Sequence, residues 1–257
     1  MTRIEPALAR KISKSQQMKD EQAQANRIYG DDIARVSTVL STWDDDPEEK
    51  LMDWAASLGH GWRESRHEAA TIGTHVHEMI EDFFKMMQRG EIVFGDSNSY
   101  MLALQRVKIR LQGVMPRHRE RVMRAFMAFM DWASRFNSIG IISLEERIIC
   151  QEMKIGGTCD FKGIIGQGGQ LLRVMLDWKT SRMTQMKHKV QLGAYSVLHK
   201  IKYPEDEPFD FYGVIRFDKM MGVWEEHYTD HDGILEAEEF FLHMVKGYHM
   251  RKKLQMF

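Results

Sequence analysis

The sequence contains few cysteines, few prolines and no long apolar run. Its two cysteines, Cys150 and Cys159, are too few for an iron–sulfur cluster, which normally needs four thiolates, and no zinc-ligand spacing is present. We therefore expect no iron–sulfur cluster built by this chain alone, and two reduced thiols in the core. No apolar segment approaches the length that spans a bilayer, and the first residues lack a signal-peptide core. These absences predict a cytoplasmic protein that does not enter a membrane.

Neither sign of charge dominates the composition. The formal net charge is −1, although 28% of the residues are charged. Without a global positive field, a nucleic-acid partner would have to be held by local basic patches. The chain has 257 residues, of which 43% are hydrophobic, and this is enough for one large domain with a substantial core.

Hydrophobic periodicity divides the chain into a polar start, a helical part and a strand-rich part. Residues 1–30 are rich in Gln, Lys and Arg and are predicted to form a polar arm. Residues 31–257 are predicted to form one domain, with a helical portion over 31–140 and a sheet-containing core over 141–257. The expected fold class is α/β, a central mixed β-sheet flanked by helices, with a helical N-terminal half. Strands are expected over 141–152, 158–165, 171–177, 210–217 and 223–228, and helices over 62–89, from about 97 to the break at 113, and over 116–136, 185–199 and 233–254.

A predicted hairpin carries the candidate chemistry. Asp160 lies on its first strand, and after a glycine-rich turn at 166–169 the chain returns to Asp177 and Lys179. Because adjacent strands lie about 4.8 Å apart, a carboxylate on each strand can converge on one hard cation. Lys179 is two residues beyond Asp177 and therefore shares its face. Two acids and one ammonium suit phosphodiester hydrolysis, in which a metal holds the phosphate and activates a water while the lysine stabilises the developing charge.

The residues of the hairpin also have ordinary structural roles that must be weighed. Asp160 follows two glycines and could be a turn or strand-edge aspartate. Asp177 ends an apolar strand, where either a metal ion or a salt bridge to Lys179 would remove the cost of burying a carboxylate. Lys179 could be an ordinary surface lysine. The peptide carbonyl of Trp178 is a further candidate oxygen ligand.

Other motifs occur in a definite order around the hairpin. Upstream, a predicted helix start has the spacing Gly-Thr-x-x-His and ends at His77, and downstream Gln191 and Tyr195 lie one helical turn apart. The order Gly-Thr-x-x-His, Glu146, Gly-x-x-Asp, Asp-x-Lys, Gln-x-x-x-Tyr resembles the RecB-like exonuclease branch of the PD-(D/E)XK nuclease superfamily. The resemblance begins at about Val36, where the segment Val-Ser-Thr-Val-Leu is similar to that of mitochondrial genome maintenance exonucleases and phage exonucleases.

The resemblance implies further metal-site residues. It selects His77 rather than His75 as an additional metal ligand, and the alternative is a helix histidine hydrogen-bonded to a neighbour. It also prefers Glu146 to Glu145 as a third metal-side carboxylate. Alternation along the strand, counted back from Ile148, favours Glu146 as well.

Three other positions have a role that the resemblance suggests and a structural alternative. Gln191 and Tyr195 are implied to contact the DNA strand or the water at the metal, or else they form a buried polar pair that closes a helix over the sheet. Ser37 looks like the residue that relatives place near the phosphate, and the alternative is a helix N-cap. Glu81, one turn after His77, either orients the imidazole or belongs to a solvated ion pair.

Basic residues gather in two stretches. The first runs from 106 to 124 with Glu120 as its only acid, and the second follows the hairpin directly. A run of charges is usually a solvated face, but the scarcity of acids favours phosphate contact. The candidate DNA-binding residues are Arg117, Arg119 and Arg121 in the first stretch and Arg182, Lys187 and Lys189 in the second.

The resemblance and the hairpin together predict a DNA exonuclease that depends on Mg²⁺ or Mn²⁺ and acts in recombination, repair or processing. The preference for an exonuclease comes from the resemblance alone. The alternatives are a structure-selective endonuclease on the same core and a non-catalytic DNA-binding module. The expected catalytic residues are Asp160, Asp177, Lys179, Glu146, Gln191 and Tyr195, and the expected metal ligands are His77, Asp160, Asp177, Glu146 and the Trp178 carbonyl.

The expected partner is DNA, either single-stranded or at duplex ends. A homo-oligomer or a recombination partner protein stays open, and so does the polarity of digestion. A bacterial or phage-infected cell is the setting that the resemblance implies.

Overall fold

A mixed β-sheet forms the centre of the protein. The computed structural model describes residues 32–42, 59–182, 184 and 186–254, so the expected polar arm over 1–30 lies outside the described residues. The sheet order is β1-β3-β4-β5-β6, and β2, which stands outside this order, also pairs with β3. Two pairings are parallel, β1 with β3 and β4 with β5, and the other pairings are antiparallel. The six strands are β1 (Ala34–Arg35), β2 (Ser138–Cys150), β3 (Ile155–Gln167), β4 (Gln170–Lys179), β5 (Phe211–Phe217) and β6 (Trp224–Thr229).

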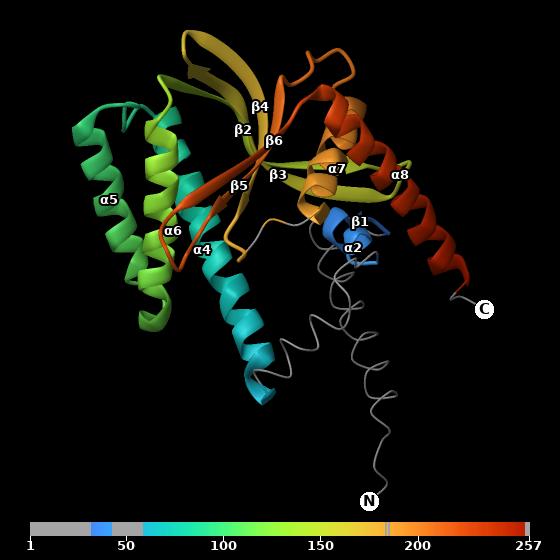
Figure 1. Cartoon of the computed structure of the whole chain (residues 1–257), viewed down its shortest axis with the longest axis horizontal. Coiled ribbons are helices and arrows are strands. Elements are labelled where there is room, and N and C mark those ends of the chain that lie inside the picture. The colour runs from blue at the N-terminus through green and yellow to red at the C-terminus, as the bar shows by residue number, and fades with distance from the viewer. Residues whose placement is uncertain (1–31, 43–58, 183, 185, 255–257) are drawn as a thin grey trace, which may run out of the picture.

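Helices cover both faces of this sheet, as Figure 1 shows. One face is covered by the helices α4, α5 and α6, and the other by the short helix α2 and two helices from the second half of the chain. This arrangement confirms the expected fold class. The first group is α4 (Trp62–Gln88), preceded by the 3₁₀ turn η1 (Gly59–Gly61), α5 (Ser97–Leu111) and α6 (Pro116–Ser134); the second is α2 (Val36–Leu40), α7 (Met186–Lys202) and α8 (His231–Leu254).

The expected elements agree with the observed ones to within a few residues. The strand β1 was not expected, because its two residues form a strand only by pairing with Ile155 and Gly156 of β3, far along the chain. The turn between β3 and β4 contains Gly168 and Gly169, both with positive φ, which glycine adopts without the steric cost that a side chain brings. Both cysteines are free and buried, as predicted.

An aromatic cluster fixes the helical layer against β4 and β5. Trp178 of β4 lies 5.4 Å from Trp132 of α6 and 5.8 Å from Phe217 of β5, measured between ring centroids. Phe84 of α4 stacks on Trp178, with centroids 6.4 Å apart. Aromatic pairs contribute about 0.5–1.5 kcal/mol each beyond their burial. Because Trp178 is anchored on this face, Asp177 and Lys179, its neighbours in β4, are directed to the opposite face.

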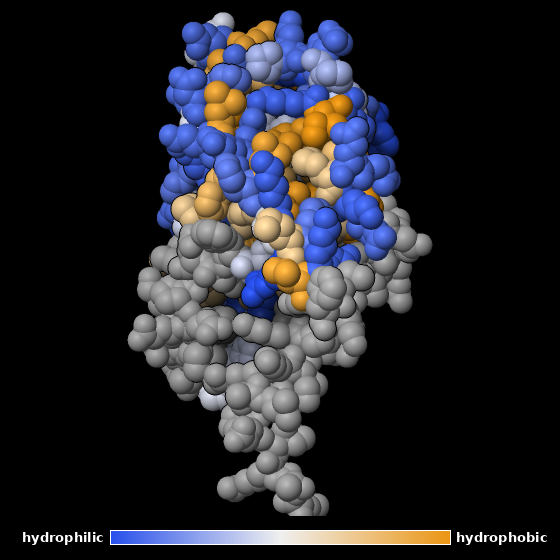
Figure 2. All heavy atoms as spheres, turned by 90° about the vertical axis from the view of Figure 1, so that its right-hand side faces the viewer, coloured by the Kyte–Doolittle hydropathy of each residue, from blue (hydrophilic) through white to orange (hydrophobic). Residues whose placement is uncertain are grey.

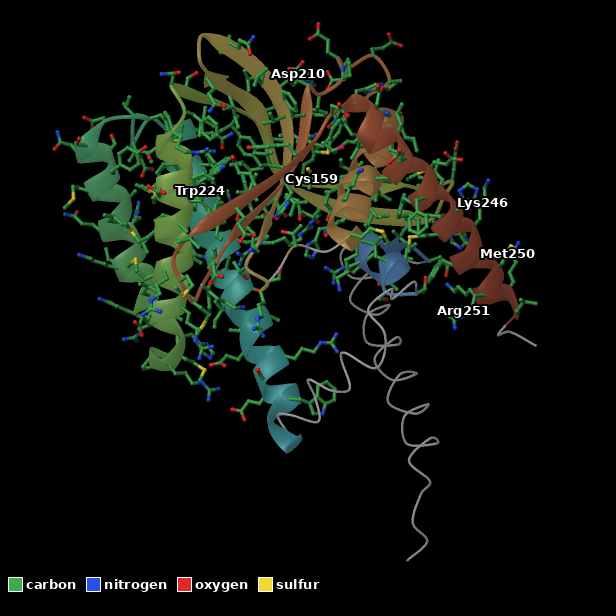
Figure 3. The ribbon with its side chains drawn as sticks, viewed as in Figure 1. Cys159, Asp210, Trp224, Lys246, Met250 and Arg251 are labelled. Carbon is green, nitrogen blue, oxygen red and sulfur yellow. The ribbon has the colours of Figure 1, made fainter. Side chains whose placement is uncertain are left out.

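The opposite face is closed by α7 and α8, which approach each other closely. A Cβ atom added to Gly193 of α7 would lie 2.6 Å from the carbonyl carbon of Ala237 in α8. Lys246, Met250 and Arg251 follow the outer side of α8 (Figure 3). The described part of the face shown in Figure 2 is mainly hydrophilic, with separate apolar patches. Among the described helices, none is long and apolar enough to cross a membrane.

A buried histidine on α7 predicts acid sensitivity. His199 is 4% exposed and lies between Lys162 and Asp206. Burial, reinforced by the charge of Lys162, lowers the pKa of His199 to about 4. In the unfolded chain His199 therefore binds a proton near pH 6.5, whereas in the folded chain it binds one only near pH 4. We expect the free energy of unfolding to fall by up to about 3 kcal/mol between these two pH values.

Urea denaturation at pH 7 and at pH 4.5 measures this loss. The His199→Gln variant should show a smaller change than the wild type, because its side chain does not titrate. His243 on α8 is exposed, so His243→Gln is the matched control and should keep the wild-type pH dependence. An equal pH dependence in His199→Gln and in the wild type would contradict the prediction.

Candidate metal centre

Three potential metal ligands converge from three elements. One ligand atom from each of His77 on α4, Glu145 on β2 and Asp160 on β3 lies within 4.8 Å of the other two. His77 Nδ1 is 3.6 Å from Asp160 Oδ2 and 3.9 Å from Glu145 Oε1. These groups are close enough to surround one ion.

The second acid of the hairpin stands beside this group. Phe161 pairs with Leu176, so the next position of the antiparallel register brings Asp160 opposite Asp177, on the same face of the sheet. The backbone N–H of Trp178 donates a hydrogen bond to Asp160 Oδ2 at 2.8 Å. The hairpin therefore brings the two aspartates together as predicted.

The carboxylate of Asp177 is buried and only partly compensated. Its side chain is 1% exposed, and the ammonium of Lys179 forms an ion pair with Oδ2. No described group donates a hydrogen bond to Oδ1. Burial raises the pKa of Asp177 to about 6 against the opposing effect of Lys179, and repulsion from Asp160 raises it further. A buried oxygen without a donor is a site at which a cation would remove the cost of burial.

Burial and neighbouring charges also shift the pKa values of Asp160 and His77. Burial raises the pKa of Asp160, although His77 and Lys179 oppose this rise. Burial alone would lower the pKa of His77, but the carboxylates of Asp160 and Glu145 outweigh it, so that the pKa is raised. Several carboxylate oxygens with one imidazole form a donor set that suits Mg²⁺ or Mn²⁺. The described residues therefore fit a divalent cation of this kind.

The structure places Glu145, and not Glu146, at this centre. Glu145 has a φ of 45°, and a register shift between Ile141 and Ser143 precedes it on β2. Alternation from Ile148 puts Glu146 on the face covered by α7, but it does not reveal that the irregular backbone brings Glu145 to His77 and Asp160. Glu146 instead contacts Lys162, Lys202 and Tyr203 on the α7 side. The sequence offered Glu145 only as the adjacent competitor.

The long helix α4 presents His77 to the site. A Cβ atom added to Gly73 would lie 3.2 Å from Thr180 Oγ1, so this glycine lets α4 approach the end of β4. His75 faces Glu78 instead, with 3.4 Å between Nδ1 and Oε2. Glu81 pairs with Lys85 at 2.7 Å, which is the solvated ion pair of the two alternatives for Glu81.

Gln191 and Tyr195 form a pair beside the two aspartates. The Gln191 amide donates to the Tyr195 hydroxyl at 2.6 Å. Burial and the charges of Asp177 and Asp160 raise the pKa of Tyr195 well above its usual value, so its hydroxyl keeps its proton. The Tyr195 ring occupies the space that Gly157 leaves, since a Cβ atom there would lie 2.7 Å from Cε1. This glycine therefore makes room for a side chain rather than for a ligand.

The basic stretch at the start of α6 is less free than its sequence indicates. Arg119 donates to the carbonyls of Val114 and Gln112, at 2.8 and 2.9 Å, and so closes the end of α5. Arg117 and Arg121 lie 3.2 Å from Glu64 and Glu68 of α4 respectively. The acids that the stretch itself lacks are supplied by another helix, which a local pattern of charges does not reveal.

The remaining predicted contacts lie at the surface. Ser37 is exposed in the first turn of the five-residue helix α2. Arg182 and Lys187 are exposed, and Lys189 lies 3.8 Å from Glu236. They stay candidates for contact with a nucleic acid.

One further basic residue, Lys219, lies outside the two basic stretches of the sequence. Lys219, in the turn between β5 and β6, donates to the carbonyl of Ala69 at 3.4 Å and has no carboxylate within ion-pair distance among the described residues. Burial, together with the charge of Arg121, lowers the pKa of Lys219. The turn is held in shape by Asp218, whose Oδ1 accepts the backbone N–H of Met220 at 2.7 Å. A constrained, half-buried ammonium that forms no ion-pair contact within the described part of the chain is suited to an anionic ligand.

Comparison with known proteins agrees with this chemistry. A family model described as the PD-(D/E)XK nuclease superfamily matches residues 52–243, most of the chain. No curated protein matches the chain. The nucleases of this superfamily use divalent metal ions, and the described donor set fits such an ion. From these observations we conclude that the chain belongs to the PD-(D/E)XK nuclease superfamily, which implies metal-dependent nuclease activity.

Proposed function

We propose that this nuclease is a DNA exonuclease of the RecB-like branch, that it depends on Mg²⁺ or Mn²⁺, and that it acts in recombination, repair or processing. The observation that carries the catalytic part is the convergence of His77, Glu145 and Asp160 beside Asp177 and Lys179. The preference for DNA ends rests on the ordered motifs of the sequence. The principal alternative is a structure-selective endonuclease built on the same core.

The residues of the site would have different roles in phosphodiester hydrolysis. His77, Glu145, Asp160 and Asp177 would hold the cation, and the Trp178 carbonyl stays a candidate further ligand. A divalent cation bound there neutralises phosphate charge and lowers the pKa of water, which supplies the nucleophile near neutral pH.

The other side chains act on the substrate. The ammonium of Lys179, on the same face as the carboxylates, stabilises the negative charge that develops on the phosphate oxygens. Tyr195, fixed by Gln191, keeps its proton and can donate a hydrogen bond to the nucleic acid. Because the site lies where β4 ends, Arg182, Lys187 and Lys189 would hold the backbone that leaves it.

Purified protein incubated with end-labelled linear DNA and with closed circular DNA tests this function. We expect Mg²⁺ or Mn²⁺ to support digestion of the linear substrate only, and EDTA to stop it. Cutting of closed circles would favour the endonuclease. No cutting of either substrate with either metal would overturn the proposal.

A second prediction concerns Lys219. Ala69, Gly73 and His77 are spaced four residues apart on α4, so Lys219 at Ala69 lies about 12 Å along the helix from His77. This distance corresponds to roughly three or four nucleotides of B-form DNA. We expect Lys219 to bind a backbone phosphate, so that Lys219→Met lowers the slope of log K against log salt by about 0.7–0.9.

Fluorescence anisotropy in EDTA at several salt concentrations measures this slope without cleavage. Lys252 lies in the last turn of α8, on the other side of the sheet, and Lys252→Met should keep the wild-type slope. If Lys219→Met also keeps the wild-type slope, Lys219 does not contact phosphate.

A further inference from the structure

Two adjacent glutamates of β2 have different surroundings, and only Glu145 lies at the metal centre. We propose that the buried ion pair between Lys162 and Glu146 is a positioning device that determines which of the two glutamates faces the metal. The inference rests on the proposed metal-dependent function and deepens it. It assigns Lys162 and Glu146 a role that does not involve contact with substrate or metal.

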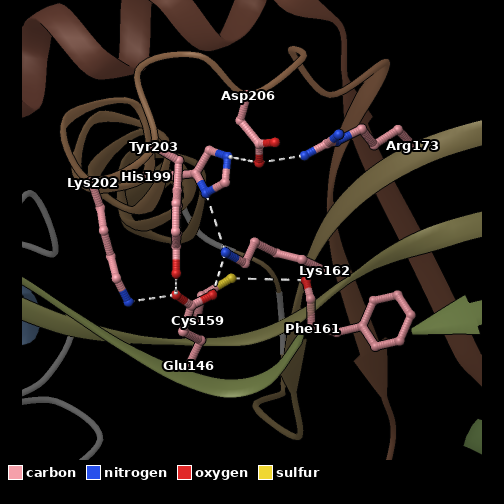
Figure 4. Close-up of polar contacts among 9 residues, drawn as sticks. All are labelled: Glu146, Cys159, Phe161, Lys162, Arg173, His199, Lys202, Tyr203 and Asp206. Atoms are coloured by element: carbon pink, nitrogen blue, oxygen red, sulfur yellow. Dashed lines mark hydrogen bonds and ion pairs between the residues drawn. The ribbon is translucent and has the colours of Figure 1, made fainter. Parts of the chain in front are cut away.

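The Glu146 carboxylate is held by three groups on the α7 side of the sheet (Figure 4). The ammonium of Lys162 forms an ion pair with Oε2. Lys202 Nζ and the Tyr203 hydroxyl donate to Oε1 at 2.7 and 2.6 Å. These contacts account for both carboxylate oxygens, so Glu146 cannot turn toward the metal centre without breaking all three.

Lys162 is itself held from several sides. It is 1% exposed, although a lysine is rarely buried so completely. Its Nζ lies 3.2 Å from His199 Nδ1 and 5.1 Å from the centre of the Tyr203 ring. Asp206 approaches His199 Nε2 at 3.2 Å and thereby extends the cluster, which Figure 4 shows as one connected set. These contacts fix the position of the Lys162 ammonium.

The backbone transmits this constraint to Glu145. Leu144 is paired with Phe161 and Glu146 with Cys159, so Glu145 lies between two fixed positions and opposite Asp160. Its φ of 45° is unfavourable for a residue with a side chain and persists only where the surroundings enforce it. With Glu146 held by Lys162, Lys202 and Tyr203, the distorted backbone leaves Glu145 as the glutamate that faces His77 and Asp160.

Stability alone does not explain the ion pair. A buried ion pair contributes little net stability compared with apolar side chains of similar volume, whereas removal of one partner is strongly destabilising. A one-residue slip of β2 against β3 would place Glu146 opposite Asp160 in place of Glu145. The ammonium of Lys162 pairs specifically with a carboxylate at position 146, whereas an apolar side chain at position 162 would not select one.

The double variant Glu146→Met/Lys162→Met separates positioning from stability. Its two apolar side chains replace the pair without leaving a buried charge, so we expect it to melt within about 4 °C of the wild type. Isothermal titration with Mn²⁺ should nevertheless show at least a tenfold weaker affinity, because Glu145 loses its orientation. Glu146→Gln, which keeps the side-chain shape but removes its charge, should bind Mn²⁺ several-fold more weakly.

A second ion pair, with a buried glutamate, provides the control. Glu238 on α8 is 8% exposed and accepts from Lys200 at 2.7 and 2.9 Å, away from the metal centre. Lys200→Met/Glu238→Met should therefore keep the wild-type affinity for Mn²⁺. Comparable weakening in this control would mean that loss of any ion pair of this kind loosens the site.

The outcomes distinguish this inference from the proposed function. Wild-type Mn²⁺ affinity in both the Glu146→Met/Lys162→Met and the Glu146→Gln proteins would overturn the positioning role. If the double variant does not fold, the Glu146→Gln titration decides alone. A wild-type protein that neither binds Mn²⁺ nor cuts DNA would instead refute the proposed function itself.

Discussion

The Asp177→Asn variant is expected to lose at least about 10²–10³-fold in DNA cleavage, the loss that follows removal of one preorganised electrostatic group from an active site. Asparagine keeps the shape of the side chain but removes the charge that would hold the cation. The buried Oδ1 of Asp177, which no described group supplies with a hydrogen bond, is the physical basis of this expectation. Single-turnover cleavage of end-labelled DNA in Mg²⁺ measures the loss.

The same variant is expected to be more stable than the wild type when no metal is present. Burial raises the folded-state pKa of Asp177 to about 6, so the carboxyl group favours folding below the unfolded pKa near 3.8 and loses this contribution as the pH rises through 6. At pH 7 the uncharged asparagine should therefore raise the free energy of unfolding by about 1–3 kcal/mol.

Asp232, exposed in the first turn of α8, provides the control. Asp232→Asn should cleave and unfold like the wild type. Wild-type cleavage by Asp177→Asn would remove this aspartate from the site.

The Lys179→Met variant is expected to show the second large effect. Cleavage should fall by about 10²–10³-fold, because methionine removes the positive charge that β4 presents beside Asp177 and keeps most of the side-chain volume. DNA binding in EDTA should persist, since Lys179 is one cation among several. Stability should also fall, by about 1–3 kcal/mol, because Asp177 is left as a buried charge without its partner.

A double variant distinguishes the two effects of Lys179. Asp177→Asn/Lys179→Met has neither charge, so its free energy of unfolding should return to the wild-type value or above, while cleavage stays at the level of the single variants. Chemical denaturation and cleavage of the same preparations provide both quantities. Full activity in Lys179→Met would show that the ammonium serves only as the counter-ion of Asp177.

The sequence was sufficient for the hairpin and for the order of the elements. Asp160 and Asp177 could be placed opposite each other because both strands are regular there and the turn between them is marked by glycines. His77 could be chosen over His75 from the spacing of its motif. In each case a local pattern carries the information.

Other features depend on contacts between distant segments. Alternation along β2 points to Glu146, whereas the backbone at Glu145 is distorted and Lys162, sixteen positions beyond Glu146, holds the Glu146 side chain away from His77 and Asp160. In the same way, the arginines of α6 look unpaired in the sequence because their acids come from α4. The turn that carries Lys219 becomes relevant only when it packs beside α4.

The most direct test of the metal centre is a crystal structure of the protein soaked with Mn²⁺, in which anomalous scattering locates the ion. The ion should lie at about 2.1–2.3 Å from carboxylate oxygens of Asp160, Asp177 and Glu145, with His77 beside it. Glu146 should stay bound to Lys162. An ion held by Glu146, or no ion between β3 and β4 at saturating Mn²⁺, would contradict the arrangement on which the proposed cleavage depends.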